Sequence, residues 1–188
     1  MGKLLLALAL WIALPCQAEV DLRSLREGGY VFYLRHASTD FSQNDASMKS
    51  FEDCASQRNL TDKGRDEARA IGEHVKRLGI PIGTVLASPF CRTMETARLA
   101  FGKAQAMTGV RGGPSQPSDP NRYESLKKLL STPVPKGENA VISSHANPFH
   151  ALVGPPYLAE GEIAVVKPGG SGFSIVGRIR LEDWQAFK

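Results

Sequence analysis

Short apolar runs alternate with amphipathic segments along most of the chain. Five of these runs predict buried strands. They are residues 30–34, 84–87, 140–143, 163–166 and 173–179. A longer segment carries apolar residues at every third or fourth position, which predicts an amphipathic helix. This helix begins near Thr61 and ends at Gly79 and Pro81, and its apolar positions are Ala68, Ile71, Val75 and Leu78.

The order of these elements predicts the fold class. Two further helices are expected at 92–101 and 123–130, with a loop at 109–121 and a turn at 145–148. Strands that alternate with helices favour a mostly parallel sheet covered on both faces. We therefore expect an α/β protein, a three-layer α/β/α sandwich with a mostly parallel central sheet. The 188 residues contain no dividing linker, so we expect a single domain.

The first 18 residues differ from the rest and predict a signal peptide. Lys3 precedes an uncharged apolar run at 4–14, shorter than the roughly 20 residues of a membrane-spanning helix. The following Cys16-Gln17-Ala18 resembles a small-x-small cleavage site. We expect residues 1–18 to be removed and the domain at 19–188 to be secreted across the inner membrane into the periplasm, with no stable membrane insertion. An uncleaved anchor and lipidation at Cys16 are the alternatives.

The charge pattern fits a small anionic substrate better than nucleic acid. Lys and Arg number 23 against 19 Asp and Glu, which gives a formal net charge of +4. The basic residues are scattered among acidic ones, whereas a nucleic-acid-binding protein concentrates them on one stripe or helix. We therefore expect no nucleic-acid partner, and the sequence leaves the oligomeric state open.

Export also changes how the cysteines are interpreted. Cys16 leaves with the signal peptide, so the exported domain keeps Cys54 and Cys91. An even pair in an oxidising compartment favours a disulfide. Two separate buried thiols are the alternative.

Polar and cationic residues follow three of the predicted strands. Arg35 and His36 follow the first strand, Arg92 lies shortly after the second, and His145 follows the third. Because ligands bind at the carboxyl ends of the strands in such sheets, we expect these side chains to converge. No carboxylate lies among these segments, so the pocket would attract an anion. The guanidinium fork matches phosphate oxygens, and histidine suits nucleophilic or proton-transfer chemistry.

Each of these residues also has a structural interpretation. Arg35 and His36 could form a solvated strand end, His145 could cap a helix, and the segment at 88–93 could be a helix N-cap. Purely structural roles at three successive strand ends would be a coincidence. A functional pocket is therefore the favoured interpretation. His150 follows His145 by five residues, which is not the spacing of a helical metal pair, so we expect no metal site.

Four motifs between residues 29 and 184 resemble those of the histidine phosphatase superfamily, also called the phosphoglycerate-mutase-like or Arg-His-Gly family. They occur in the order of that family. They are Leu34-Arg35-His36-Ala37 with Thr39, Leu60-Thr61-x-x-Gly64-x-x-x-Ala68, Ser88-Pro89-x-x-Arg92-Thr93-x-x-Thr96-Ala97, and Ser144-His145.

This resemblance implies a mechanism and a class of substrate. His36 would attack phosphorus and become a phosphohistidine, which water then hydrolyses, while Arg35, Arg92 and His145 bind the phosphoryl oxygens. Neither a metal nor another cofactor is implied. The substrate would be a phosphorylated small molecule or glycan, such as a sugar or cell-envelope component. A phosphoprotein phosphatase acting on phosphohistidine, and a non-catalytic phosphate-binding module, are the alternatives.

The sequence departs from the family pattern at three positions. Ala37 replaces the usual glycine, which keeps the turn only if the backbone needs no positive φ. Ser42 stands where many mutase-like members carry Asn, which favours a plain phosphatase. Ala146 replaces the Asp that donates the proton in the acid-phosphatase branch, so the general acid lies elsewhere. We place Asp119 first in that role, with Glu124, Glu160 and Glu162 as alternatives.

Overall fold

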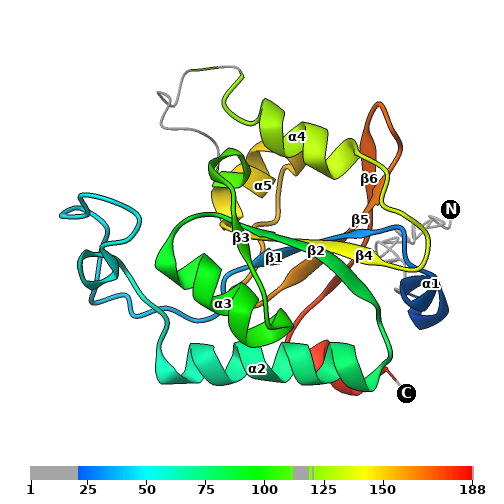
Figure 1. Cartoon of the computed structure of the whole chain (residues 1–188), viewed down its shortest axis with the longest axis horizontal. Helices are drawn as coiled ribbons and strands as arrows, with labels where there is room; N and C mark the ends of the chain where they lie inside the picture. Colours follow the sequence, from blue (N-terminus) through cyan, green and yellow to red (C-terminus); the bar gives the residue numbers. More distant parts are fainter. Residues whose placement is uncertain (1–20, 112–118, 120, 188) are drawn as a thin grey trace, which may run out of the picture.

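The computed structural model describes residues 21–111, 119 and 121–187. The predicted signal peptide and most of the predicted loop at 109–121 lie outside these residues. The described chain forms one six-stranded sheet in the order β3-β2-β4-β1-β5-β6 (Figure 1). The strands are β1 (Val31–Arg35), β2 (Ile82–Ala87), β3 (Gln105–Ala106), β4 (Asn139–Ser144), β5 (Ile163–Pro168) and β6 (Phe173–Ile179).

The sheet is mixed. The strand pairs β1 with β4, β2 with β4 and β2 with β3 are parallel, whereas β1 with β5 and β5 with β6 are antiparallel. A short turn connects β5 to β6 as a hairpin, and such a connection permits only antiparallel pairing. The parallel pairs are in the majority, so the expected mostly parallel α/β sheet is confirmed, with an antiparallel hairpin at one edge.

Helices cover both faces of the sheet (Figure 1). They are α1 (Leu22–Glu27), α2 (Asp62–Arg77), α3 (Cys91–Phe101), α4 (Glu124–Ser131) and α5 (Ala146–Val153). Strand β1 shows why the layers form, because its successive side chains enter opposite cores. Phe32 and Leu34 join the core beneath α2 and α3, whereas Val31 and Tyr33 join the core beneath α4 and α5.

The longest predicted helix begins where its polar cap residue lies. The Thr61 hydroxyl accepts a hydrogen bond from the Gly64 amide at 2.9 Å and so caps α2. A side chain at Gly64 would collide with the backbone oxygen of Ser38, so this position needs glycine. The close approach packs the start of α2 against the segment that follows β1, which is the segment carrying His36.

Two features differ from the sequence prediction. The predicted turn at 145–148 is wrong, because α5 begins at Ala146 and His145 is its N-cap. Pro148 lies in the first turn of this helix, where a proline is tolerated since its missing N–H would have no intrahelical partner. The short elements α1 and β3 were also not predicted. No helix in the described ranges is long and apolar enough to cross a membrane.

Candidate active site

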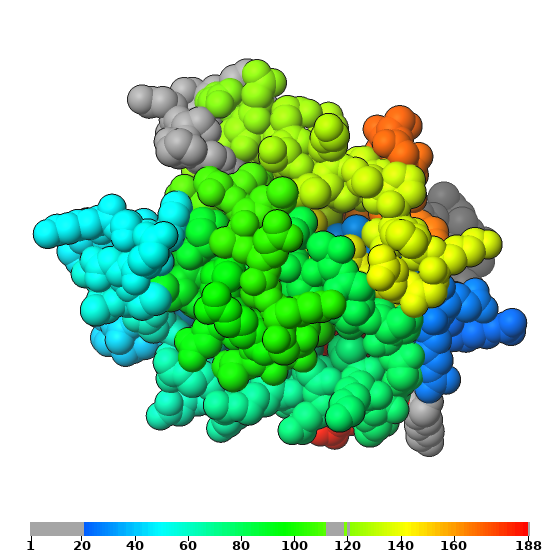
Figure 2. Space-filling view, in the orientation of Figure 1, coloured from blue at the N-terminus to red at the C-terminus, as the bar shows by residue number. Residues whose placement is uncertain are grey.

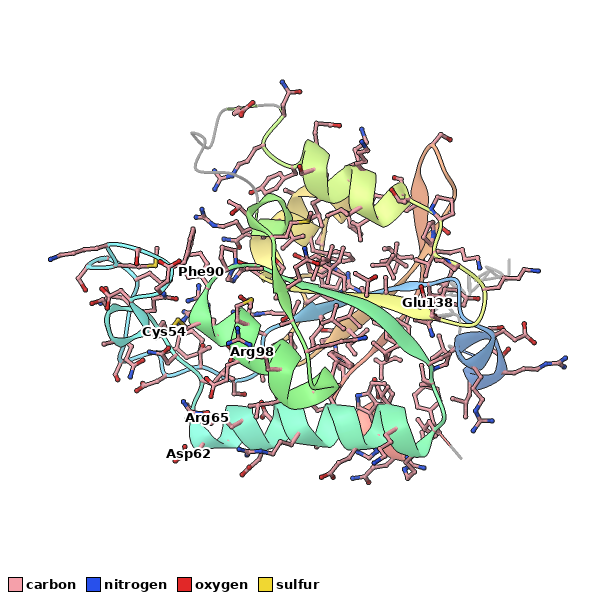
Figure 3. The ribbon with its side chains drawn as sticks, in the orientation of Figure 1. Cys54, Asp62, Arg65, Phe90, Arg98 and Glu138 are labelled. Carbon is pink, nitrogen blue, oxygen red and sulfur yellow. A yellow bond between two sulfur atoms is a disulfide. The ribbon has the colours of Figure 1, made fainter. Side chains whose placement is uncertain are left out.

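Three chain segments meet where β1, β2 and β4 end. The neighbouring strands place Arg35 opposite Ser144, and the His36 amide donates to the Ser144 carbonyl at 3.0 Å. The Ser88 amide donates to Ser143 at 2.9 Å in the same way. Glu138, just before β4, lies at the opposite end of the sheet from Phe90 (Figure 3). The parallel register therefore brings the segments that carry His36, Arg92 and His145 to one end of the sheet.

These segments surround a cavity of about 620 Å³. It is lined by polar and cationic side chains from several loops as well as from the strand ends. The charged and histidine side chains are Arg35, His36, Asp45, Arg58, Arg92, Arg111, Arg122 and His145. Among the described lining residues, five guanidinium groups thus share the cavity with a single carboxylate, which makes it a site for an anion.

His36 is held in one tautomer and kept neutral. Its side chain is 2% exposed, and Nδ1 lies 3.0 Å from the Ala37 carbonyl oxygen. A carbonyl can only accept, so Nδ1 donates the proton and Nε2 keeps its lone pair. Burial lowers the pKa of His36 to about 3, and the charges of Arg92 and Arg35 act in the same direction. A neutral ring with a free Nε2 is the form required of a nucleophile.

His145 faces the same cavity. Burial lowers the pKa of His145 well below its ordinary value, and the neighbouring His36 ring and Arg92 act in the same direction. Its Nε2 lies 2.9 Å from the Ser88 hydroxyl, and the Tyr33 hydroxyl donates to its carbonyl at 2.8 Å. The His36 and His145 rings meet edge to face with centroids 5.5 Å apart. The two histidines that the sequence placed at separate strand ends are therefore neighbours.

The expectation that no carboxylate neutralises the converging arginines is wrong. Asp45 binds Arg92 with both oxygens, at 3.0 and 3.1 Å. Glu160 lies 3.6 Å from Arg35 and 3.8 Å from Nδ1 of His36, and it accepts a hydrogen bond from Thr39 at 2.7 Å. The interpretation failed because it considered only the segments that follow the strands, and both acids come from other loops.

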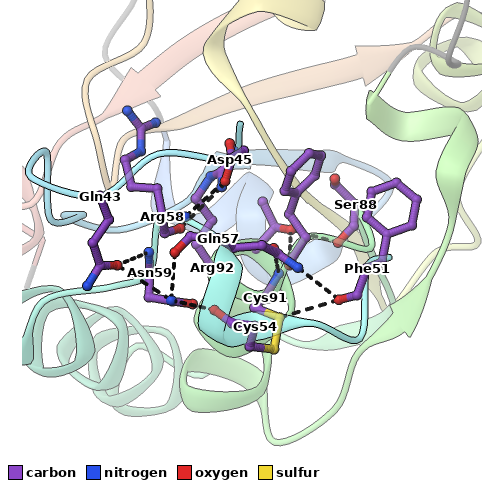
Figure 4. Close-up of a disulfide and its surroundings, with 12 residues drawn as sticks. Gln43, Asp45, Phe51, Cys54, Gln57, Arg58, Asn59, Ser88, Cys91 and Arg92 are labelled. Atoms are coloured by element: carbon purple, nitrogen blue, oxygen red, sulfur yellow. Dashed lines mark hydrogen bonds and ion pairs between the residues drawn. A yellow bond between two sulfur atoms is a disulfide. The ribbon is translucent and has the colours of Figure 1, made fainter. Parts of the chain in front are cut away.

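The segment at 41–59 brings Asp45 and Arg58 to the cavity. It projects as a cyan lobe in the space-filling view (Figure 2), and a disulfide between Cys54 and Cys91 joins it to the start of α3 (Figure 4). The buried Gln57 strengthens this link, since its Oε1 accepts from the Cys91 amide at 2.9 Å and its Nε2 donates to Phe51 at 3.0 Å. The disulfide therefore lies one residue from Arg92.

The threonines of the third motif hold the turn after β1. The Thr96 hydroxyl accepts from the Ala37 amide at 3.2 Å and donates to the Arg92 carbonyl at 2.7 Å. None of the described residues other than glycine has a positive φ. Ala37 therefore meets the condition under which it can replace the usual glycine.

The four carboxylates considered as general acid lie in different surroundings. Glu124 is exposed and faces Lys127 at 3.6 Å. Glu162 is buried, accepts from the Ala159 amide at 2.7 Å and faces Arg178 at 3.8 Å. Asp119 is half-buried and accepts from the Asn121 amide at 2.9 Å.

None of these acids, nor Glu160, lies among the cavity-lining residues of the described chain. Asp119 comes three residues before the lining Arg122, whereas Glu160 faces the Nδ1 side of His36.

Four charged lining residues were missed by the sequence interpretation: Asp45, Arg58, Arg111 and Arg122. All four lie in connecting segments, whose position depends on contacts distant in the sequence. One available signal was the predicted disulfide, because bridging Cys54 to Cys91 necessarily brings the neighbouring Arg58 close to Arg92. Groups of three or more His, Cys, Asp or Glu side chains able to hold a metal ion do not occur in the described part of the chain.

Residues 31–111 match the model of the histidine phosphatase superfamily, branch 1. The match contains Arg35, His36 and Arg92, which line the cavity. Over this segment the chain is similar to the histidine phosphatase superfamily. A comparison of the sequence with curated proteins gives no match.

Solved structures of two phosphatases and a mutase share the fold of this chain. The protein histidine phosphatase SixA complexed with tungstate is 20% identical with a TM-score of 0.55, over 82% of this chain and 98% of that one. A mutant phosphoserine phosphatase from Entamoeba histolytica, in complex with phosphoserine, is 12% identical with a TM-score of 0.56, over 82% and 98%. A phosphoglycerate mutase from Bacillus anthracis is 12% identical with a TM-score of 0.57, over 87% and 98%.

Proposed function

We propose that the protein is an exported phosphatase that hydrolyses phosphomonoesters through a phosphohistidine on His36, without a metal ion. The match of residues 31–111 to the histidine phosphatase superfamily supports phosphatase activity. The predicted signal peptide and the disulfide between Cys54 and Cys91 support export to an oxidising compartment.

The observation that carries this proposal is the state of His36 within the cationic cavity. The ring is neutral, Nδ1 donates to Ala37, and Nε2 remains available for attack. Five arginines line the same cavity and can hold a phosphoryl group in front of this nitrogen. A binding module needs the arginines but has no need of a buried neutral histidine in this tautomer.

In the first step Nε2 of His36 attacks phosphorus, and the bond from phosphorus to the ester oxygen breaks. Arg35, Arg92 and His145 bind the three non-bridging oxygens and stabilise their charge in the transition state. The departing oxygen takes a proton from a carboxylic acid, a role that we assign to Asp119 because it adjoins the lining segment that contains Arg122.

In the second step water attacks phosphorus, the bond from phosphorus to Nε2 breaks, and inorganic phosphate leaves. The same carboxylate, now ionised, accepts the proton of the attacking water. His36 returns to its neutral form with Nδ1 still bonded to Ala37, so the tautomer is preserved through the cycle. The cavity of about 620 Å³ suits a phosphorylated sugar or a cell-envelope component.

One observation favours a second candidate, hydrolysis of phosphohistidine in proteins. Asp45, the single carboxylate among the described lining residues, is already paired with Arg92. A substrate with a good leaving group needs little help from an acid. Comparing an alkyl phosphate with a phosphohistidine peptide separates the two candidates, since only the phosphomonoesterase hydrolyses both.

The test is phosphate release from an aryl phosphate by the mature protein in the presence of a chelator. We expect His36→Ala to abolish release while the fold is retained by circular dichroism. His150→Ala is the matched control, because this ring stacks on Tyr157 outside the cavity with centroids 3.8 Å apart. Full activity of His36→Ala would reject the mechanism. The absence of release from the folded wild type would favour a binding module.

Export has its own test. Fractionation of cells that express the full chain should place the protein in the periplasm, and N-terminal sequencing should begin after Ala18. A protein that retains its first 18 residues in the membrane fraction would reject cleavage.

A further inference from the structure

The side chain of Ser88 contacts one of the two site histidines. Its hydroxyl oxygen lies 2.9 Å from Nε2 of His145. Ser88 is fully buried, and it is not among the described residues that line the cavity. A serine that acted as a nucleophile beside a histidine would have to reach the substrate. Ser88 does not reach it, so the contact with His145 has another role.

The backbone anchors Ser88 to two elements of the fold. The Ser88 amide donates to the Ser143 carbonyl at 2.9 Å, and the Ser88 carbonyl lies 2.6 Å from the Thr93 hydroxyl. Ser143 belongs to β4 and Thr93 to α3. Because these contacts hold the residue on both sides, its short side chain places the hydroxyl beside His145.

The His145 ring also contacts two aromatic rings. Phe90 meets it edge to face with centroids 5.1 Å apart, and His36 does the same at 5.5 Å. These contacts restrict the plane of the ring but do not distinguish its two nitrogens. Since Nε2 is bonded to Ser88, Nδ1 is the nitrogen left for a ligand in the cavity that His145 lines.

The position of one proton decides what His145 can do. Burial lowers the pKa of His145 well below its ordinary value, so the ring is neutral and only one nitrogen carries hydrogen. A phosphoryl oxygen is an acceptor and needs that hydrogen on Nδ1. Nε2 then keeps its lone pair, and the Ser88 hydroxyl has to donate to it. A hydroxyl can do so because it both donates and accepts.

We propose that Ser88 is a positioning residue, which donates a hydrogen bond to Nε2 of His145 and so keeps the proton of that ring on Nδ1, toward the bound phosphoryl group. This inference rests on the proposed phosphatase function, in which His145 binds a phosphoryl oxygen. Both site histidines then carry their proton on Nδ1. His36 presents its lone pair to phosphorus, whereas His145 presents its N–H to an oxygen.

The tautomer is measured by long-range proton–nitrogen NMR on the mature protein with isotope-labelled histidine. A ring nitrogen with a lone pair resonates far from a protonated one, and His145→Gln identifies the His145 signals by their loss. With saturating inorganic phosphate, we expect Nδ1 to be protonated and Nε2 not. A proton on Nε2, or on both nitrogens, would overturn the proposal. So would a His145 ring whose signals do not respond to phosphate.

Ser88→Ala removes the hydroxyl with little change in volume. We expect the Nε2 resonance of His145 to move in the phosphate complex, because its lone pair loses a donor. We also expect kcat/KM to fall about ten-fold, a part of the loss of about 100-fold or more that follows removal of a transition-state donor. An unmoved Nε2 resonance would show that the hydroxyl does not donate.

Ser143→Ala is the matched control. Ser143 is also fully buried, and its hydroxyl donates to the Thr93 carbonyl at 2.9 Å, so this variant loses a hydrogen bond of the same length without touching the Nε2 contact. We expect it to keep the His145 signals and to keep kcat/KM within about two-fold. Equal losses in Ser88→Ala and Ser143→Ala would mean a general effect of buried hydroxyls and would reject a role through His145.

A double variant tests whether Ser88 acts through His145. The two substitutions are then not additive, so Ser88→Ala should cost less than about two-fold in a His145→Gln background. An undiminished loss in that background would overturn the proposal. If the wild type releases no phosphate, the proposed function fails, and the tautomer measured with inorganic phosphate still decides the role of Ser88.

Discussion

Asp45 accepts hydrogen bonds from both terminal nitrogens of the Arg92 guanidinium, with Oδ1 3.0 Å from Nη1 and Oδ2 3.1 Å from Nη2 (Figure 4). This is the bidentate geometry with which arginine also binds a phosphoryl group. Burial acts to raise the pKa of Asp45, but the hydrogen bonds from Arg92 and the Arg58 amide outweigh it, and the pKa is lowered overall. An ionised carboxylate therefore competes with the substrate for Arg92.

We expect Asp45→Asn to bind inorganic phosphate more tightly, because the substitution removes a negative charge that competes for Arg92. The gain should be about three- to ten-fold in Kd, the range expected for one charge-assisted contact. Isothermal titration measures it, with Asp62→Asn as the control on an exposed carboxylate of α2. Weaker binding by Asp45→Asn would instead mean that Asp45 is needed to hold Arg92 in position.

Stability should fall as the pH drops below about 6.5, and His36 should contribute to that fall. Its folded pKa is about 3, below the ordinary value of 6.5, so the unfolded chain takes up a proton in this window and the folded chain does not. One such group costs about 1.4 kcal/mol per pH unit between these values. Thermal melts from pH 7 to 5 should show a shallower dependence for His36→Gln than for wild type, while His150→Gln keeps the wild-type slope. Identical slopes for His36→Gln and wild type would contradict the lowered pKa.

The central residues of the site could be predicted because they adjoin strands that local sequence patterns reveal. Arg35, His36 and His145 directly follow apolar strands, and the parallel register of β1 and β4 then brings them together. Asp45 and Arg122 lie in irregular segments with no periodicity, and the place of Asp45 in the cavity depends on contacts such as the disulfide. Such contacts join residues far apart in the sequence, so no local pattern reveals them.

The same reasoning explains the error at α5. Asn147-Pro148 after an apolar strand has the composition of a turn, and the sequence was interpreted in that way. A proline in the first helical turn is equally compatible with a helix start. The packing of Phe149 against Tyr33, with ring centroids 4.7 Å apart, favours the helix.

The disulfide should stabilise both the fold and the site. Cys54 and Cys91 are 37 residues apart, and closing a loop of that length restricts the unfolded chain by about 4 kcal/mol. Replacing both by serine should lower the free energy of unfolding by about this amount. It should also lower kcat/KM, because the segment carrying Asp45 and Arg58 loses its link to α3. Denaturant titration and phosphate release measure the two effects.

A thiol count provides the control for that experiment. The mature wild type, denatured without reductant, should show no free thiol, since Cys54 and Cys91 are its two cysteines. Two reactive thiols would contradict the bridge. A destabilised variant with unchanged kcat/KM would show that the site does not depend on it.

Asp119 should matter most for poor leaving groups. An alkoxide needs a proton as it departs, whereas nitrophenolate does not, so Asp119→Asn should slow alkyl phosphates by about 100-fold and leave nitrophenyl phosphate nearly unchanged. Glu160→Gln is the comparison, because Glu160 faces Nδ1 of His36 at 3.8 Å and Arg35 at 3.6 Å. Its replacement should affect both substrates alike, through the position of these two residues. If Glu160→Gln shows the leaving-group dependence and Asp119→Asn does not, the proton donor is Glu160.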